Sequence, residues 1–170
     1  MIRLPASLTT GPNRFREFDQ LSDSMIEEWM HRKSSGSSAS PSESAAGYLK
    51  RESYRIISHY ISQGRTRIFE EVIRRDGRAL TSRVRLDENP FHFGLLALFS
   101  DDEVMSKQDR STFSSQMLYA YHHSIPPRLL VGFIYQAGAK GEIKRKLTEG
   151  CIEPGFENVY KPDVSNVIAD

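Results

Sequence analysis

Cysteine, long apolar runs and net charge are all scarce in this chain of 170 residues. The single cysteine, Cys151, excludes an internal disulfide framework and a cysteine-based metal cluster. The longest apolar run, residues 91–99, is far shorter than the roughly 18 residues that a membrane-spanning helix requires. The start of the chain also lacks the continuous apolar stretch of a secretory signal peptide. We therefore expect a soluble protein with no membrane span, in a reducing compartment such as the cytoplasm, an organelle matrix or a host cell into which it is delivered.

The charges of the chain are almost balanced. Lysine and arginine together number 23 and the acids number 22, which gives a formal net charge of +1. This balance argues against a generic nucleic-acid binder, because such proteins rely on an excess of positive charge. Any attraction to an anionic surface or to nucleic acid must therefore come from a local patch. With 38% hydrophobic residues the chain can bury the core of one domain.

Residues 65–86 are the best-defined stretch and predict a β-hairpin. The Asp76-Gly77 dipeptide tolerates the positive φ values of a two-residue turn, and apolar and polar residues flank it on both sides. In this register one face supplies core side chains: Phe69, Ile73, Leu80, Val84 and Leu86. A helix over residues 67–75 stays open as the alternative, because Ile68, Val72 and Ile73 also fit a helical stripe.

The second face of the predicted hairpin is basic. Residues 65–86 hold seven arginines against three acids, so this stretch has a net charge of +4 within a chain of net charge +1. We expect Arg74, Arg78 and Arg85 to bind an anionic partner, whereas Arg83 faces Glu70 across the ladder and is partly neutralised. The alternative is that this face is merely solvated.

Residues 17–33 predict an amphipathic helix. Six apolar residues recur at helical spacing: Phe18, Leu21, Met25, Ile26, Trp29 and Met30. The Ser-rich residues 34–45 indicate a linker, and residues 1–16 indicate a flexible N-terminal segment. The helix is therefore expected to be tethered, so that it can dock on its own domain, on a partner or on a second copy of the chain. Trp29 is its candidate binding residue.

Residues 46–150 are expected to form the core domain, followed by an irregular tail over residues 151–170. A helix over residues 47–63 is followed by Gly64 as its C-cap. The other expected elements are a strand over residues 128–137, a helix that starts at residues 100–103, and two segments, 91–99 and 111–124, that fit either a strand or a helix. The predicted fold is a single compact α+β domain with a central β-hairpin or antiparallel sheet packed by helices, preceded by the tethered helix.

The residue types that catalysis needs lie outside any recognisable motif. They are His59, His92, His122, His123 and Cys151. A nucleophile or an acid–base group requires a partner at a defined position, and the sequence names none for these side chains. We therefore assign no catalytic residue, no metal site and no cofactor.

One enzyme class uses residue types that occur here in the same order. Mono-ADP-ribosyltransferase toxins have an arginine on a first strand, a Ser-Thr-Ser run and a late Gln/Glu-x-Glu motif. Here Arg67, residues 111–114 and then Glu149 or Glu153 follow one another. Phe113 interrupts the serine run and no Glu-x-Glu motif completes the set, so no membership of that family is claimed.

Two hypotheses for the function remain. The first is a non-enzymatic interaction module or accessory subunit of a larger assembly, which binds a protein partner through the tethered helix and the basic hairpin face. The second is a small enzyme, a transferase or hydrolase, with a secreted bacterial effector that acts on a phosphate-bearing substrate as one form of it. A deep pocket with a histidine or glutamate beside Arg67 or Arg85 would favour the enzyme, and a flat basic face would favour the interaction module.

Overall fold

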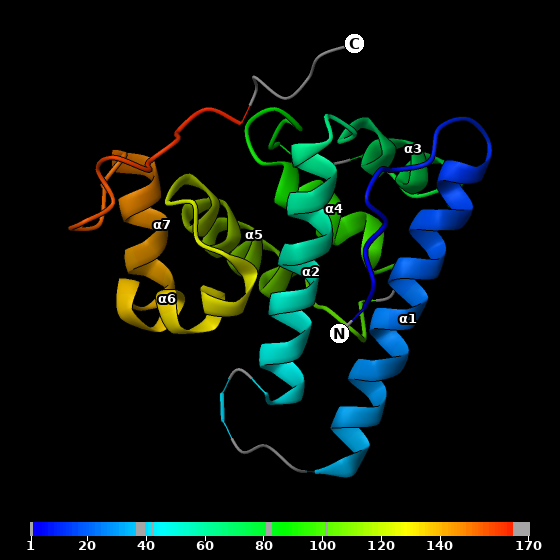
Figure 1. Cartoon of the computed structure of the whole chain (residues 1–170), viewed down its shortest axis with the longest axis horizontal. Coiled ribbons are helices and arrows are strands. Elements are labelled where there is room, and N and C mark those ends of the chain that lie inside the picture. The colour runs from blue at the N-terminus through cyan, green and yellow to red at the C-terminus, as the bar shows by residue number, and fades with distance from the viewer. Residues whose placement is uncertain (1, 37–39, 42, 81–82, 101, 165–170) are drawn as a thin grey trace.

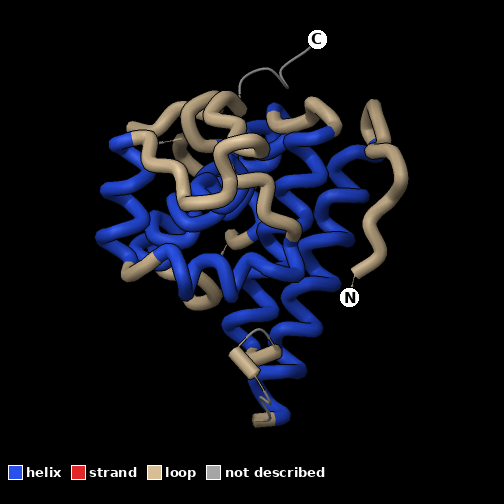
Figure 2. The backbone as a smooth tube through the Cα atoms, turned by 60° about the vertical axis from the view of Figure 1, so that its left-hand side comes forward, coloured by secondary structure: helices blue, strands red, loops and turns tan. Residues whose placement is uncertain are grey.

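The structure, a computed structural model, describes residues 2–36, 40–41, 43–80, 83–100 and 102–164. Within these residues all regular secondary structure is helical. Its helices are α1 (Asn13–Ser35), α2 (Ala45–Ser62), α3 (Arg67–Arg75), α4 (Pro90–Leu98), α5 (Lys107–His122), α6 (Leu130–Ala137) and α7 (Lys140–Glu149), with a short 3-10 turn, η1 (Pro127–Leu129), before α6. Figure 2 shows only helices and loops along the described backbone. The predicted α+β fold with a central hairpin or antiparallel sheet is therefore wrong.

The stretch predicted as the first strand of the hairpin is helix α3. Its four apolar side chains, Ile68, Phe69, Val72 and Ile73, are all buried in the core. Spacings of one, four and five residues place them on one side of a helix, whereas the hairpin register would have turned Ile68 and Val72 towards solvent. The helix alternative for residues 67–75 is thus the one that the structure shows.

The Asp76-Gly77 dipeptide ends α3 and does not turn a hairpin. Gly77 has a φ of 68°, its N–H donates to Arg74 O at 3.0 Å, and the Arg78 N–H donates to Ile73 O at 3.0 Å. This pair of bonds is a Schellman motif, which requires the same positive φ as a tight hairpin turn. Residues 81–82 of the expected second strand lie outside the described residues, and the described residues around them form no strand.

The apolar segments that follow are also helices. The strand predicted over residues 128–137 is η1 and α6, in which Leu130, Phe133, Ile134 and Ala137 are buried at helical spacing. Segments 91–99 and 111–124, whose sequences fit either a strand or a helix, lie largely in helices α4 and α5. The helix expected to start at residues 100–103 begins later, at Lys107, after Ser106 as its N-cap, and Asp101 lies outside the described residues.

The two longest helices, α1 and α2, run side by side, and α5, α6 and α7 lie on the other side of α2 (Figure 1). Helix α4 packs against α2, α3 and α5, so it lies at the centre of the molecule. Aromatic rings join these helices: Tyr54 of α2 stacks on Phe91 of α4 with centroids 5.5 Å apart, and Phe18 of α1 meets Tyr60 of α2 edge-on at 5.5 Å.

Helix α1 is part of the common core and is not merely tethered to it by the Ser-rich segment. Phe18, Leu21 and Met25 are buried among the residues of the common core. The helix expected over residues 17–33 lies within α1, and residues 37–39 and 42 of the predicted linker lie outside the described residues. The docking surface of this helix is therefore its own chain.

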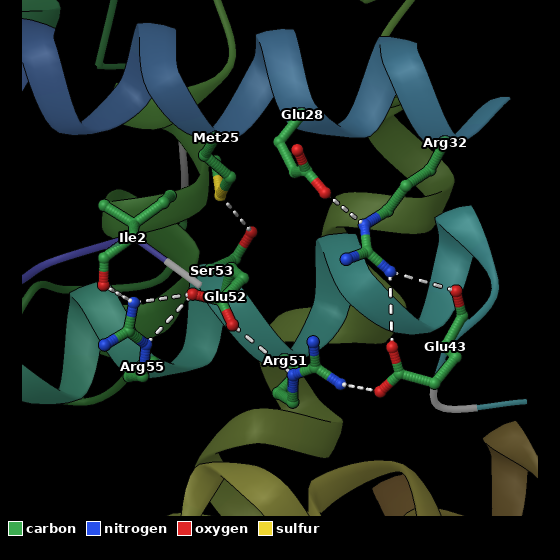
Figure 3. A network of polar contacts seen from close by, with 9 residues as sticks. All are labelled: Ile2, Met25, Glu28, Arg32, Glu43, Arg51, Glu52, Ser53 and Arg55. Carbon is green, nitrogen blue, oxygen red and sulfur yellow. Dashed lines mark hydrogen bonds and ion pairs between the residues drawn. The ribbon is translucent and has the colours of Figure 1, made fainter. Parts of the chain in front are cut away.

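A polar network fixes α1 and the N-terminal segment to α2 (Figure 3). At its centre Glu52 is 0% exposed and accepts hydrogen bonds from Arg55 at 2.7 and 3.0 Å and from Arg51 at 3.4 Å. Arg55 also donates to Ile2 O, which holds the start of the described chain against α2. On the other side, Arg51 pairs with Glu43 at 3.0 Å, and Glu43 and Glu28 both pair with Arg32 of α1. A buried carboxylate needs such partners, because its desolvation is otherwise costly.

Candidate functional site

Two of the predicted binding residues, Arg74 and Arg85, line one groove. The groove lies beside α3, has a volume of about 550 Å³, and is also lined by Arg67, Leu80 and Phe93. The side chains of Arg74 and Arg85 are 62% and 72% exposed. Each has a nearby acid: Arg74 lies 3.5 Å from Glu70, and Arg85 lies 2.5 Å from Asp87. Glu70 therefore pairs along the helix with Arg74, whereas the hairpin register had placed it opposite Arg83.

The third predicted binding arginine, Arg78, points into the molecule. Its Nη1 donates to the carbonyl oxygens of Leu96 and Phe99, at the C-terminal end of α4, the latter at 3.4 Å. Its Nη2 lies 3.1 Å from Asp76 Oδ2. The terminal carbonyls of a helix carry a partial negative charge, so an arginine there stabilises the fold. In this structure Arg78 joins α3 to α4 and does not face the groove.

Trp29, the fourth predicted binding residue, is half-buried on α1 and packs against the core of its own chain. The Lys33 ammonium lies 5.1 Å from the centroid of the Trp29 ring and makes a cation–π contact with it. The neighbouring Met30 is the exposed apolar residue of this helix. The structure thus separates Trp29, on α1, from the arginines beside α3.

A second hollow adjoins the groove and shares Arg67 and Glu71 with it. This cavity, of about 300 Å³, is lined by residues 8–11, by Arg14 at the start of α1, by Tyr60 and Gly64 at the end of α2, and by Arg65, Arg67, Ile68 and Glu71. Arg14 Nε lies 3.0 Å from Glu71 Oε2, and Arg14 Nη1 donates to Gly11 O at 2.7 Å. Within the described residues neither Arg65 nor Arg67 makes an ion pair, and both are exposed.

The starts of two helices border this cavity. Helix α1 begins at Asn13 after Pro12, helix α3 begins at Arg67 after Thr66, and neither first turn has a side-chain cap. The loop between α2 and α3 is short because Gly64, with a φ of 65°, ends α2 in a second Schellman motif, as its position in the sequence predicts. Arg65 N–H donates to Tyr60 O at 2.9 Å in that motif, which fixes Arg65 at the mouth of the cavity.

Tyr60 is the buried polar side chain of this cavity. The residue is 1% exposed, and its hydroxyl is buried without a hydrogen-bond partner in the described part of the chain. Burial raises the pKa of this hydroxyl, and the carboxylates of Glu17 and Asp19 raise it further. The hydroxyl therefore stays protonated, and it lies behind the wall of the cavity with no surface open to it.

His123 and its neighbours form the densest group of chemically capable side chains, but they hold one another. His123 Nδ1 donates to Tyr119 O at 2.7 Å, and its Nε2 accepts from the Glu153 N–H at 2.9 Å. The Glu153 carboxylate accepts from the Tyr119 hydroxyl at 2.8 Å and from Lys146 at 2.6 Å. Burial would raise the pKa of Glu153, but the bonds from Lys146 and Tyr119 outweigh it and lower that pKa. The group anchors the C-terminal segment to α5 and α7.

The other candidate residues are not brought into a joint arrangement. Cys151 is half-buried with its Sγ 3.7 Å from Glu149 Oε2, and His122 is buried with neither ring nitrogen hydrogen-bonded in the described residues. His59 and His92 lie on α2 and α4, and none of the residues that line the groove or the cavity is a histidine or cysteine. Over the described residues, no group of three or more His, Cys, Asp and Glu side chains could hold a metal ion.

The residues that follow the order seen in ADP-ribosyltransferases do not come together in the structure. Arg67 lies on α3, whereas Glu149 lies at the end of α7, on the far side of the molecule (Figure 1). Phe113 lies on α5 with the Lys50 ammonium 4.3 Å from its ring centroid. The glutamate that does lie beside Arg67, Glu71, is already paired with Arg14.

Three residues of the cavity carried no special signal in the sequence. Arg14 belonged to a segment expected to be flexible, Tyr60 to the apolar stripe of a helix, and Arg65 to the general excess of arginine. Only the fold brings these three together, because the start of α1 lies beside the loop between α2 and α3.

Across the described residues, none of the helices combines the length and the apolar character that crossing a bilayer demands. In comparisons with protein families, curated proteins and solved structures, no family model matches the chain, and neither a curated protein nor a solved structure matches it significantly.

Proposed function

We propose that this protein is a non-enzymatic interaction module or accessory subunit that binds an acidic segment of a protein partner. The binding surface is the basic face, defined here as Arg14, Arg65, Arg67, Arg74 and Arg85, which line the cavity and the groove beside α3.

The observation that carries this proposal is that two neighbouring arginines of this face are left without acids. The other three arginines of the face each pair with an acid, Arg14 with Glu71, Arg74 with Glu70 and Arg85 with Asp87. Arg65 and Arg67 have no carboxylate within 4.0 Å in the described residues. An exposed pair of unneutralised charges in a nearly neutral chain attracts anions locally, although its contribution to stability is small.

The residues beside these arginines fit a binding surface better than a catalytic site. No histidine or cysteine lines either hollow, and the one glutamate of the cavity is paired with an arginine. A general base or nucleophile needs a free lone pair facing the substrate, and Glu71 uses its carboxylate on Arg14. The groove also offers apolar contacts from Leu80 and Phe93, which an extended acidic peptide can cover.

The test is binding of a fluorescently labelled oligo-glutamate peptide, followed by anisotropy over a salt titration. The triple variant Arg67→Gln, Arg74→Gln, Arg85→Gln should weaken binding by about tenfold or more and flatten the salt dependence. The matched control, Lys107→Gln, Arg128→Gln, Lys144→Gln, removes the same charge from exposed positions on other elements and should bind like the parent. Equal weakening by both triple variants would show that only net charge matters, and would refute the basic face as a binding surface.

A further inference from the structure

We propose that the cavity beside the starts of α1 and α3 binds a single phosphate group, the chemistry shared by a phosphorylated side chain and free phosphate. This deepens the proposed function, on which it rests, by naming the group that the partner presents. The groove then holds the acidic segment that flanks the phosphate.

The charge of the cavity suits a small anion. Arg65 and Arg67 lie at its edge without ion pairs in the described residues, whereas Arg14 is held in place by Glu71 and by Gly11 O. A phosphate group can accept hydrogen bonds from the guanidinium groups of Arg65 and Arg67. A planar guanidinium group matches the geometry of phosphate oxygens.

The two helix starts add positive charge at the same place. Helices α1 and α3 both start at this cavity without a side-chain cap, and α1 has no acid in its first turn. The N–H groups of Arg14, Ile68 and Phe69 already donate to backbone oxygens, at 3.3, 3.3 and 3.1 Å. The helix starts therefore contribute through the partial positive charge of their dipoles, which an anion stabilises.

The cavity is larger than a phosphate ion alone requires. At about 300 Å³ it has the volume of roughly ten water molecules. A phosphate group with the end of the side chain that carries it can occupy this space, and the adjoining groove continues along α3 through their shared residue Arg67.

The experiment follows backbone amide NMR signals of the full chain during titration with inorganic phosphate, at constant ionic strength with chloride as the comparator. We expect saturable shifts confined to residues 10–14 and 64–68, and none with chloride. Arg65→Gln should weaken phosphate binding about tenfold, as the loss of a charge-assisted hydrogen bond does. Arg67→Gln should weaken it to a similar extent, and Arg74→Gln with Arg85→Gln, outside the cavity, should leave it unchanged. Shifts equal in chloride, or phosphate binding that neither Arg65→Gln nor Arg67→Gln alters, would overturn the proposal.

A second arm separates the phosphate site from the proposed function. Two acidic peptides are compared that differ only in one serine, which is phosphorylated in the first. The phosphopeptide should bind more tightly, through Arg65 and Arg67. Equal affinity of the two peptides, with no response to inorganic phosphate, would refute the phosphate site and leave the basic face standing. Phosphate binding in the cavity without binding of either peptide would support the site and refute the acidic-segment partner.

Discussion

The close approach of α2 and α4 predicts that Gly94→Ala destabilises the protein. A Cβ added at Gly94, on α4, would lie 2.6 Å from Cγ1, 2.8 Å from Cδ1 and 2.9 Å from Cγ2 of Ile57, on α2. All three distances are below the range of real Cβ contacts, and Ile57 is fully buried. Because both branches of this β-branched side chain are close, no rotation about its χ1 angle removes the clash.

The magnitude follows from two opposing terms. Forcing a methyl group into a packed core costs about 1–3 kcal/mol, and replacing glycine by alanine within a helix returns up to about 1 kcal/mol. We expect Gly94→Ala to lower the free energy of unfolding by about 1–2 kcal/mol, which is a fall in Tm of about 2–8 °C for a chain of this size. Urea and thermal unfolding followed by circular dichroism measure both quantities.

Two further variants identify the cause. Gly132→Ala, in α6, makes the same exchange in a helix where nothing lies within 4 Å of the new Cβ, so it should be neutral or stabilising. Ile57→Ala alone should cost about 2–5 kcal/mol, and adding Gly94→Ala to it should cost less than the sum, with a coupling of about 0.5–3 kcal/mol. If Gly94→Ala raises stability as much as Gly132→Ala does, the packing of α4 on α2 described here is wrong.

Three other predictions concern polar side chains. Arg78→Ala should lower the Tm because the carbonyls at the end of α4 lose their donor, whereas Arg74→Ala should leave it within error; equal Tm values for the two variants would contradict this difference. Glu52→Gln should lower the free energy of unfolding by about 2–3 kcal/mol in urea titrations, since it removes a buried charge between two arginines, and parent-like stability would disprove that role. Burial lowers the pKa of His122 to about 4, and its neighbour His123 adds to this decrease. The unfolded chain therefore binds the extra proton first, and stability should fall as pH drops from about 6.5 towards 4. His122→Phe should remove much of that fall in a series of urea titrations, the exposed His31→Gln is the control, and an unchanged pH profile for His122→Phe would refute the assignment.

The sequence predicted the existence of most elements better than their type. Apolar spacing located α1 and α2, and Gly64 was correctly placed as a C-cap, because these signals depend on local backbone chemistry. At residues 128–137 the β-branched and aromatic content favoured a strand, although Leu130, Phe133, Ile134 and Ala137 follow a helical stripe. For a short apolar run, composition and periodicity conflict, and tertiary packing decides between them.

The hairpin error has a specific physical origin. Asp76-Gly77 supplies a residue with positive φ, which both a tight hairpin turn and a Schellman helix end require. The dipeptide therefore could not discriminate between the two. The discriminating residues were Ile68 and Val72, which a hairpin exposes and a helix buries, and the structure buries both.

Helix formation also changes which arginines can act together. Arg67 and Arg74 are seven residues apart, so on a helix they lie on nearly the same side, about 10 Å apart along its axis. Arg75 is turned instead towards Asp19 of α1, at 2.8 Å, and Arg78 points inward from the end of α3 to the carbonyls of α4.

The sequence identified a local excess of arginine, but not which arginines stay unpaired, because that depends on the acids that neighbouring helices bring close to them. With Arg65 held at the end of α2 and Arg67 at the start of α3, the two unpaired charges lie at the junction of two helices, beside the positive end of the α3 dipole. We therefore expect a phosphate group and a run of carboxylates to differ in their dependence on Arg65 and on Arg74.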